Sequence, residues 1–268
     1  MINKTAVDLT HLQFNNKKYS QNSYGCYLKS YETINGKRRH YKMSNYDSYR
    51  LVFGFESINE CIVSRVLDCL DIEHLNYELL YAKVKVDNNI FNTYLCASYE
   101  YKKKNERKIA FDNYYEVNRK NNESQIDFIK RIGFEDYLYN MLFADYLIFN
   151  RDRHGSNIEV LMDNKNNIRL SPLFDQGMSL LLSDYENEEY VKSYDILKSE
   201  PANNFFGTRS TRENLEFIKN KNLIKKYELT EKDFKYIFED LKSIIPKYTI
   251  EKLKTFLIER LKVWKSLL

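Results

Sequence analysis

The stretch from Tyr146 to Gly177, YLIFNRDRHGSNIEVLMDNKNNIRLSPLFDQG, constrains the fold more than any other part of the chain. An apolar segment typical of a buried helix ends here in a polar loop that contains Asp152 and Asn157. Two mostly apolar runs follow, at 158–162 and 168–174, with turn-forming residues between them at 163–167. A hairpin of this length folds back on itself, so we expect Asp175 to return to the side of Asn157.

Phosphoryl transfer from ATP explains this spacing. The protein must orient the attacking hydroxyl with a carboxylate and provide oxygen ligands for the magnesium that bridges the phosphates. Asp152 and Asn157 have the D-x-x-x-x-N spacing of a kinase catalytic loop, which predicts Asp152 as the base and Asn157 as a metal ligand. Asp175, followed by Gln176 and Gly177, has the position of the D-F-G aspartate, which binds magnesium.

The same residues carry a family resemblance. The segment 150–157, NRDRHGSN, and the later LSPLFD at 170–175 resemble the N-x-D-R-H-x-x-N and L-x-P-x-[FY]-D motifs of HipA-like serine/threonine kinases. The resemblance implies ATP and Mg²⁺ as cofactors and includes His154 in the nucleotide site. Phosphatidylinositol kinases have a related D-R-H-x-x-N, so the loop alone does not separate protein substrates from lipid substrates.

The amino-terminal part predicts a small sheet with a phosphate-binding lysine. Asn35-Gly36 is a strong hairpin signal, and the strand after it, 38–43, contains Lys42. The order of strand, turn and strand matches a kinase small lobe, so Lys42 is the expected contact of the ATP phosphates. Lys29, on the preceding strand, is the second candidate, and an ordinary surface lysine is the alternative for either.

A helix is predicted over 57–70 from apolar residues at helical spacing. Its Glu60 is placed to pair with the phosphate-binding lysine, although a first-turn glutamate also suits the helix dipole. Two alternating strands follow at 77–86 and 90–99, and the chain leaves them at Tyr99, where we expect a hinge against which adenine packs.

The phosphate loop departs from the kinase pattern, because Gly25 is the single glycine in that region. Its backbone N–H groups remain potential phosphate ligands. HipA-like kinases autophosphorylate a serine in this loop, so the resemblance makes Ser20 and Ser23 candidates, with an ordinary loop serine as the alternative for each.

These elements predict an α+β, bilobal protein-kinase-like fold in one domain of residues 1–268. The amino lobe, 1–100, would be a small antiparallel sheet with one helix, and the carboxy lobe, 101–268, would be mainly helical. Helices are expected at 134–149, 213–227, from Thr230 and at 249–268, with an irregular substrate-binding segment at 180–212. Asp145, within the apolar face of the first of these helices, is either buried near the catalytic loop or turned to solvent.

Composition narrows the function classes. A net charge of +4 is too small to indicate nucleic acid as a direct partner, and no window is apolar enough to span a membrane. The four cysteines form no C-x-x-C pair, and we expect them to be reduced. The sequence therefore predicts a cytoplasmic protein, with secretion as an effector not excluded.

The leading hypothesis is an ATP- and magnesium-dependent serine/threonine protein kinase, of a compact type without the additional amino-terminal subdomain of larger HipA-like kinases. The resemblance implies a protein substrate, and an antitoxin or other regulatory protein as a partner if the chain is a toxin. Three alternatives stay open: a lipid or small-molecule phosphotransferase, a catalytically inactive nucleotide-binding scaffold, and a metal-dependent phosphoesterase, for which the sequence offers few histidine ligands.

Overall fold

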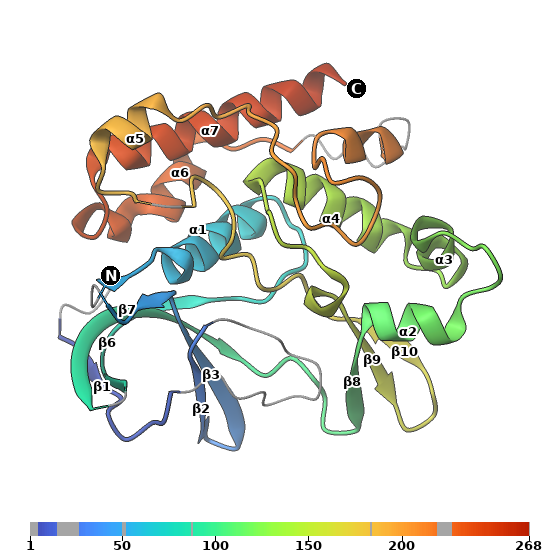
Figure 1. Cartoon of the computed structure of the whole chain (residues 1–268), viewed down its shortest axis with the longest axis horizontal. Helices are drawn as coiled ribbons and strands as arrows, with labels where there is room; N and C mark the ends of the chain where they lie inside the picture. The colour runs from blue at the N-terminus through green and yellow to red at the C-terminus, as the bar shows by residue number, and fades with distance from the viewer. Residues whose placement is uncertain are drawn as a thin grey trace.

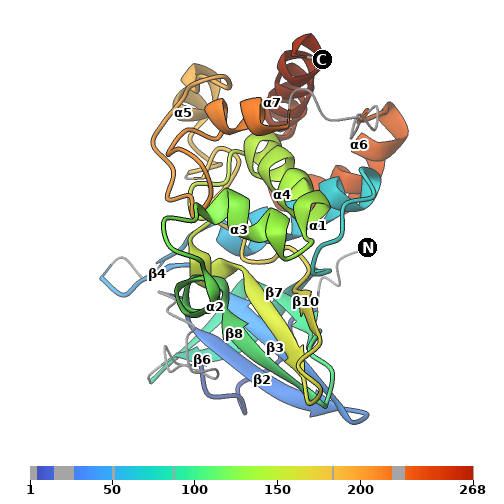
Figure 2. The ribbon, with the colours of Figure 1, turned by 90° about the vertical axis from the view of Figure 1, so that its right-hand side faces the viewer.

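The computed structural model describes residues 5–14, 27–49, 52–86, 88–182, 184–218 and 227–267. Strands gather on one side of the molecule and most helices on the other (Figure 1). Figure 2 shows the same division from the side, with α1 and α4 between the strands and the carboxy-terminal helices.

The main sheet has five strands in the order β1-β6-β7-β3-β2. Their bounds are β1 Val7–Asp8, β2 Lys29–Ile34, β3 Lys37–Met43, β6 Glu78–Val86 and β7 Asn89–Tyr99. All neighbours are antiparallel except β1, which pairs with β6 in parallel. The expected antiparallel sheet is therefore confirmed for its four longer strands, and the short first strand is the exception.

The turn between β2 and β3 shows why this hairpin forms. Asn35 and Gly36 both have positive φ, 49° and 76°. Left-handed backbone at both positions matches the twist of the flanking strands, and Asn-Gly adopts it with little steric cost. The register that follows pairs Lys29 with Lys42.

Helix α1, Glu56–Cys69, packs against β6 and β7 on one side and against α6 on the other (Figure 1). Its apolar residues belong to a large core cluster that also contains α4 and α7. A second, smaller cluster lies on the other face of the main sheet and includes Leu9, Met43 and Leu95. Lys42 and Met43 are adjacent in β3, so they point to opposite faces of the sheet.

Three more strands form a second sheet in the order β10-β9-β8. They are β8 Glu106–Ala110, β9 Glu159–Asp163 and β10 Ile168–Leu170. A separate two-stranded sheet consists of β4 Tyr46–Asp47 and β5 Val52–Phe53. The hairpin expected after Asn157 is β9 and β10. Strand β8 was not among the strands predicted from the sequence, because charged residues dominate the region 102–108.

The remaining elements are mainly helical. They are α2 Phe111–Asn118, α3 Gln125–Arg131, α4 Glu135–Ile148, η1 Gly155–Asn157, α5 Glu188–Ser193, η2 Glu213–Phe217, α6 Glu231–Phe238, η3 Glu239–Ser243 and α7 Lys247–Ser266. Thr230 caps α6 through a reciprocal capping box with Asp233. The buried Trp264 of α7 packs on Phe143 of α4, with ring centroids 5.2 Å apart.

Two sequence-based expectations need correction. The described part of the helix expected at 213–227 is a short 3₁₀ helix, η2, and 219–226 lie outside the described residues. The segment 180–212 is not wholly irregular, because it contains α5. In the described part of the chain, no helix is both long and apolar enough to cross a membrane.

Candidate active site

The loop after α4 is shaped by the end of that helix. Phe149 has a left-handed backbone, φ 52°, and the N–H of Asn150 donates to the Asp145 carbonyl at 2.9 Å. The buried Asn150 side chain then accepts from the backbone N–H of Asp152 at 3.1 Å. The helix therefore places Asp152 directly beyond its carboxyl end.

Arg153 anchors this loop through buried hydrogen bonds. It is 1% exposed and donates to both carboxylate oxygens of Asp145, at 2.9 and 3.0 Å. The same guanidinium donates to the Phe174 carbonyl at 2.8 Å and to the Asn157 carbonyl at 3.2 Å. Burial alone would lower the pKa of Arg153, but Asp145 raises it above its ordinary value. The open question about Asp145 is answered: its side chain is buried and paired.

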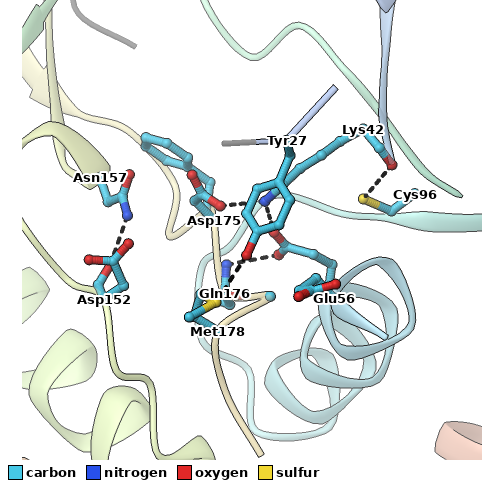
Figure 3. A network of polar contacts seen from close by, with 12 residues as sticks. Tyr27, Lys42, Glu56, Cys96, Asp152, Asn157, Asp175, Gln176 and Met178 are labelled. Atoms are coloured by element: carbon cyan, nitrogen blue, oxygen red, sulfur yellow. Dashed lines mark hydrogen bonds and ion pairs between the residues drawn. The ribbon is translucent and has the colours of Figure 1, made fainter. Parts of the chain in front are cut away.

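The β9–β10 hairpin brings Asp175 back to the loop, as its length predicted. Asp175 has a left-handed backbone, φ 57°, and the Arg153 bond to the preceding carbonyl holds it close to the loop after α4. Its carboxylate forms an ion pair with Lys42 of β3. Figure 3 shows Asp175 between Lys42 on one side and Asp152 with Asn157 on the other.

Lys42 also pairs with Glu60 of α1, with 2.7 Å between Nζ and Oε1. The other oxygen of this fully buried glutamate accepts from the backbone N–H of Gln176 at 2.9 Å. Burial alone would lower the pKa of Lys42, but Asp175 and Glu60 raise it well above its ordinary value. The lysine therefore stays charged, and the expected pair of lysine and helix glutamate is present in the structure.

The Asp175 carboxyl responds in the opposite sense. Burial alone would raise its pKa, but Lys42, and then Lys29, hold it below its ordinary value. Lys29 lies across from Lys42 in the hairpin register, so both lysines are on the same face of the sheet. Asp175 is therefore a carboxylate, the form that a metal ion requires.

Tyr27 covers this cluster. The Lys42 ammonium lies 4.7 Å from the centre of its ring, and the phenol donates to the Met178 sulfur at 2.9 Å (Figure 3). Burial raises the pKa of the phenol, with Glu56 as a further cause, so Tyr27 is neutral. Tyr27 was not among the residues expected from the sequence.

Asp152 and Asn157 meet through a backbone contact. The Asn157 amide nitrogen donates to the Asp152 carbonyl at 2.8 Å, so the amide oxygen is free of this bond (Figure 3). The Asp152 carboxylate accepts from the Asn203 amide at 3.0 Å, and His154 Nε2 lies 3.7 Å from its other oxygen. The loop therefore presents one carboxylate and one amide oxygen, as the motif predicted.

The donor set suits magnesium. Mg²⁺ prefers hard oxygen ligands and is usually held by one or two carboxylates together with phosphates and water. Asn157 and Asp175 supply one amide oxygen and one carboxylate from adjacent segments that Arg153 ties together. In the described ranges, no group of three or more His, Cys, Asp or Glu side chains could hold a metal ion by itself.

The structure does not bring Tyr99 into the cluster. Cross-strand pairing puts Tyr99 opposite Arg39 and Cys96 opposite Lys42, so Tyr99 and Lys42 project from opposite faces. The Tyr99 ring lies 5.6 Å from the Arg39 guanidinium carbon and is 43% exposed. Gly25, Ser20 and Ser23 lie outside the described residues.

The segment expected to be the hinge carries Glu100 instead, two residues beyond Ser98 on the Lys42 face. Its carboxylate lies 3.0 Å from Lys108 Nζ and 3.4 Å from His40 Nε2. Burial would raise the pKa of Glu100, but His40 and Lys108 bring it well below its usual range. Lys108 belongs to β8, so this ion pair joins the second sheet to the residue that follows β7.

Comparison with known proteins gives a structural match only. No protein-family model matches the sequence, and no curated protein matches it. Among solved structures, the chain is similar to the proinflammatory kinase CtkA of Helicobacter pylori, with a TM-score of 0.62 and 16% identity over 98% of this chain and 97% of CtkA. A complex of HipA, HipB and operator DNA from Shewanella oneidensis MR-1 matches at a TM-score of 0.41 and 13% identity, over 94% of this chain and 60% of that one. The chain therefore has the α+β, kinase-like fold of CtkA, which confirms the fold that its resemblance to HipA-like kinases implied.

Proposed function

We propose that this protein is an ATP- and magnesium-dependent serine/threonine protein kinase of the HipA-like type. One observation carries the proposal: four segments distant in sequence, β3, α1, the loop after α4 and the segment after β10, converge on the ion-paired group of Lys42, Glu60 and Asp175 beside Asp152 and Asn157. The fold shared with a kinase supports it.

Each side chain has a role that its contacts suit. Lys42 is fixed by two carboxylates and keeps its charge, so its ammonium can hold the phosphates of a nucleotide. The Asp152 side chain is partly exposed, so its carboxylate can orient a substrate hydroxyl and accept the hydroxyl proton. When bound by Asn157 and Asp175, Mg²⁺ would neutralise charge on the phosphates.

The finer parts of the proposal follow from the motif resemblance. The acceptor is a serine or threonine hydroxyl of a protein, and Ser20 and Ser23 are the candidates for autophosphorylation. We assign a nucleotide-site role to His154 and a phosphate-loop role to Gly25, and propose a division into lobes near residue 100. A regulatory partner protein such as an antitoxin, and a cytoplasmic location, belong to the same proposal.

The test is transfer of labelled phosphate. Purified protein is incubated with MgCl₂ and γ-labelled ATP, and incorporation is measured for wild type, Asp152→Ala and Asp175→Ala. Loss of a base in proton transfer costs about 10²- to 10⁴-fold, so Asp152→Ala should incorporate at least about 100-fold less label while ATP still shifts the melting temperature. Asp175→Ala should also weaken the magnesium-dependent part of that shift.

Asp136→Ala is the matched control, because Asp136 is exposed in the first turn of α4. It should retain wild-type transfer. Mass-spectrometric mapping of the label tests Ser20 and Ser23. Wild-type activity in both site variants would rule out the kinase assignment, whereas nucleotide binding without transfer to protein would favour a different acceptor or an inactive scaffold.

A further inference from the structure

We propose that Asn203 is a positioning residue that holds Asp152 in its catalytic orientation; the proposal rests on the kinase function proposed above. The side-chain nitrogen of Asn203 donates to Asp152 Oδ1 at 3.0 Å. The two residues are separated by 51 positions in the sequence. The contact is therefore made by the tertiary fold, and it engages the carboxylate expected to act as the base.

The backbone around Asn203 is fixed to the catalytic loop. The N–H of Asn203 donates to the Arg151 carbonyl at 2.8 Å, and the N–H of Phe205 donates to the Arg153 carbonyl at 2.9 Å. These two bonds flank Asp152 on both sides. The distance between Asn203 and Asp152 is thus set by the main chain and does not depend on the long side chains around them.

Aromatic packing stabilises the same segment. The ring of Phe205 lies 5.6 Å from Phe111 of α2 and 5.1 Å from Phe206, which is 1% exposed. Gly155 in the catalytic loop allows this approach, because a Cβ there would lie 2.9 Å from the Phe205 ring. The donor is therefore carried by an anchored segment although Asn203 itself is exposed.

The hydrogen bond gives the two carboxylate oxygens of Asp152 different roles. Oδ1 is occupied by Asn203, while Oδ2 lies 3.7 Å from His154 Nε2 and is the oxygen left for a substrate hydroxyl. An aspartate without this donor would rotate among rotamers and spend less time aimed at the hydroxyl. A base held in place before substrate binds contributes to rate through orientation, so the bond acts on the transfer step.

The experiment compares Asn203→Ala, Asn203→Asp and Asn204→Ala with wild type, in transfer from MgATP to casein. Asn203→Ala should lower kcat about tenfold and change the KM for ATP less than twofold. Asn203 contacts the proposed base, Asp152, and lies outside the ion-paired group of Lys42, Glu60 and Asp175. Asn203→Asp has the same shape but no N–H, and its carboxylate repels Asp152, so it should lower kcat further than alanine.

Asn204→Ala is the matched control, because the neighbouring amide donates to the Thr208 carbonyl within the segment and not to Asp152. It should keep kcat within about twofold of wild type. Equal kcat in wild type and Asn203→Ala overturns the proposal, as do parallel losses of kcat and melting temperature in Asn203→Ala and Asn204→Ala. Absence of transfer by wild type overturns the kinase function and this proposal with it.

Discussion

Replacing Arg153 by methionine should destabilise the protein strongly. The substitution keeps much of the side-chain volume and leaves the Asp145 carboxylate, 3% exposed, without its ionic partner. Breaking a buried pair in this way costs about 3–5 kcal/mol. The Phe174 and Asn157 carbonyls also lose the donor at 2.8 and 3.2 Å, at about 1 kcal/mol each. Because neighbouring losses are not additive, we expect about 4–6 kcal/mol in total.

Urea unfolding followed by the fluorescence of Trp264 measures this loss, since Trp264 is the single tryptophan and is buried. A domain with about 5–15 kcal/mol of stability would lose a large part of it. In the wild type the Asn150 amide donates to Asp145 at 2.9 Å. The double variant Asp145→Asn/Arg153→Met removes both charges and retains an acceptor for this amide. It should be more stable than Arg153→Met by about 2 kcal/mol.

Two results would refute this reasoning. An Arg153→Met variant within about 1 kcal/mol of wild type would show that the buried pair contributes little. A double variant no more stable than Arg153→Met would show that the unpaired Asp145 charge is not the source of the loss.

Three further predictions concern the fold. Gly36→Ala should cost about 1 kcal/mol in urea unfolding, because φ is +76° and no atom lies near enough for the new Cβ to gain a contact; an unchanged midpoint would contradict it. Thr230→Val should cost about 1 kcal/mol through loss of the capping box, whereas Thr230→Ser should be nearly neutral. Glu100→Gln should reduce stability at neutral pH but not at low pH. His40 and Lys108 outweigh burial and lower the pKa of the Glu100 carboxyl, so the ionised carboxylate stabilises the fold above its unfolded pKa of 4.5. This stabilisation is lost as the pH falls towards the folded pKa. A difference in melting temperature from wild type that stays constant between pH 7 and pH 2 would contradict this sign.

Local signals were sufficient for much of the fold. The Asn35-Gly36 turn, the apolar spacing of α1 and the Thr230 cap each act over a few residues, and the structure has all three. The hairpin that returns Asp175 was also predicted, because its two strands and turn are contiguous in sequence. Strand β8 was missed because its charged residues gain their strand partners from β9, about 50 residues later.

The site was predictable only where motif and chain order sufficed. From the sequence alone Asp145 could be buried or turned to solvent, and Arg153 was present in the motif, yet pairing the two required the loop geometry. The strand that ends at Tyr99 was predicted, but the direction of its side chain was not. The face on which a strand residue projects depends on the register against a distant strand. Asn203 gave no sequence signal, since its contact depends on the path of a segment rich in turn formers.

Helix α1 has attachments outside the main sheet. Its Arg65 donates to both oxygens of Asp240, at 2.6 and 2.9 Å, and to the Ile237 carbonyl at 2.8 Å. Near its other end, the Asn59 amide donates to the carbonyls of Gly177 and Ser179. Both ends of the helix are thereby tied to the carboxy-terminal part of the chain.

These ties make α1 a link between the two sides of the molecule, because its first turn is also bonded to the end of β3. The Ser57 N–H donates to Ser44 Oγ at 2.9 Å, and the Ser57 hydroxyl donates to the Lys42 carbonyl at 3.1 Å. In sequence the helix lies between β3 and β6, so it joins strands of the main sheet to the carboxy-terminal helices. A displacement of α1 would therefore move Glu60 together with the backbone that carries Lys42, and would preserve their ion pair.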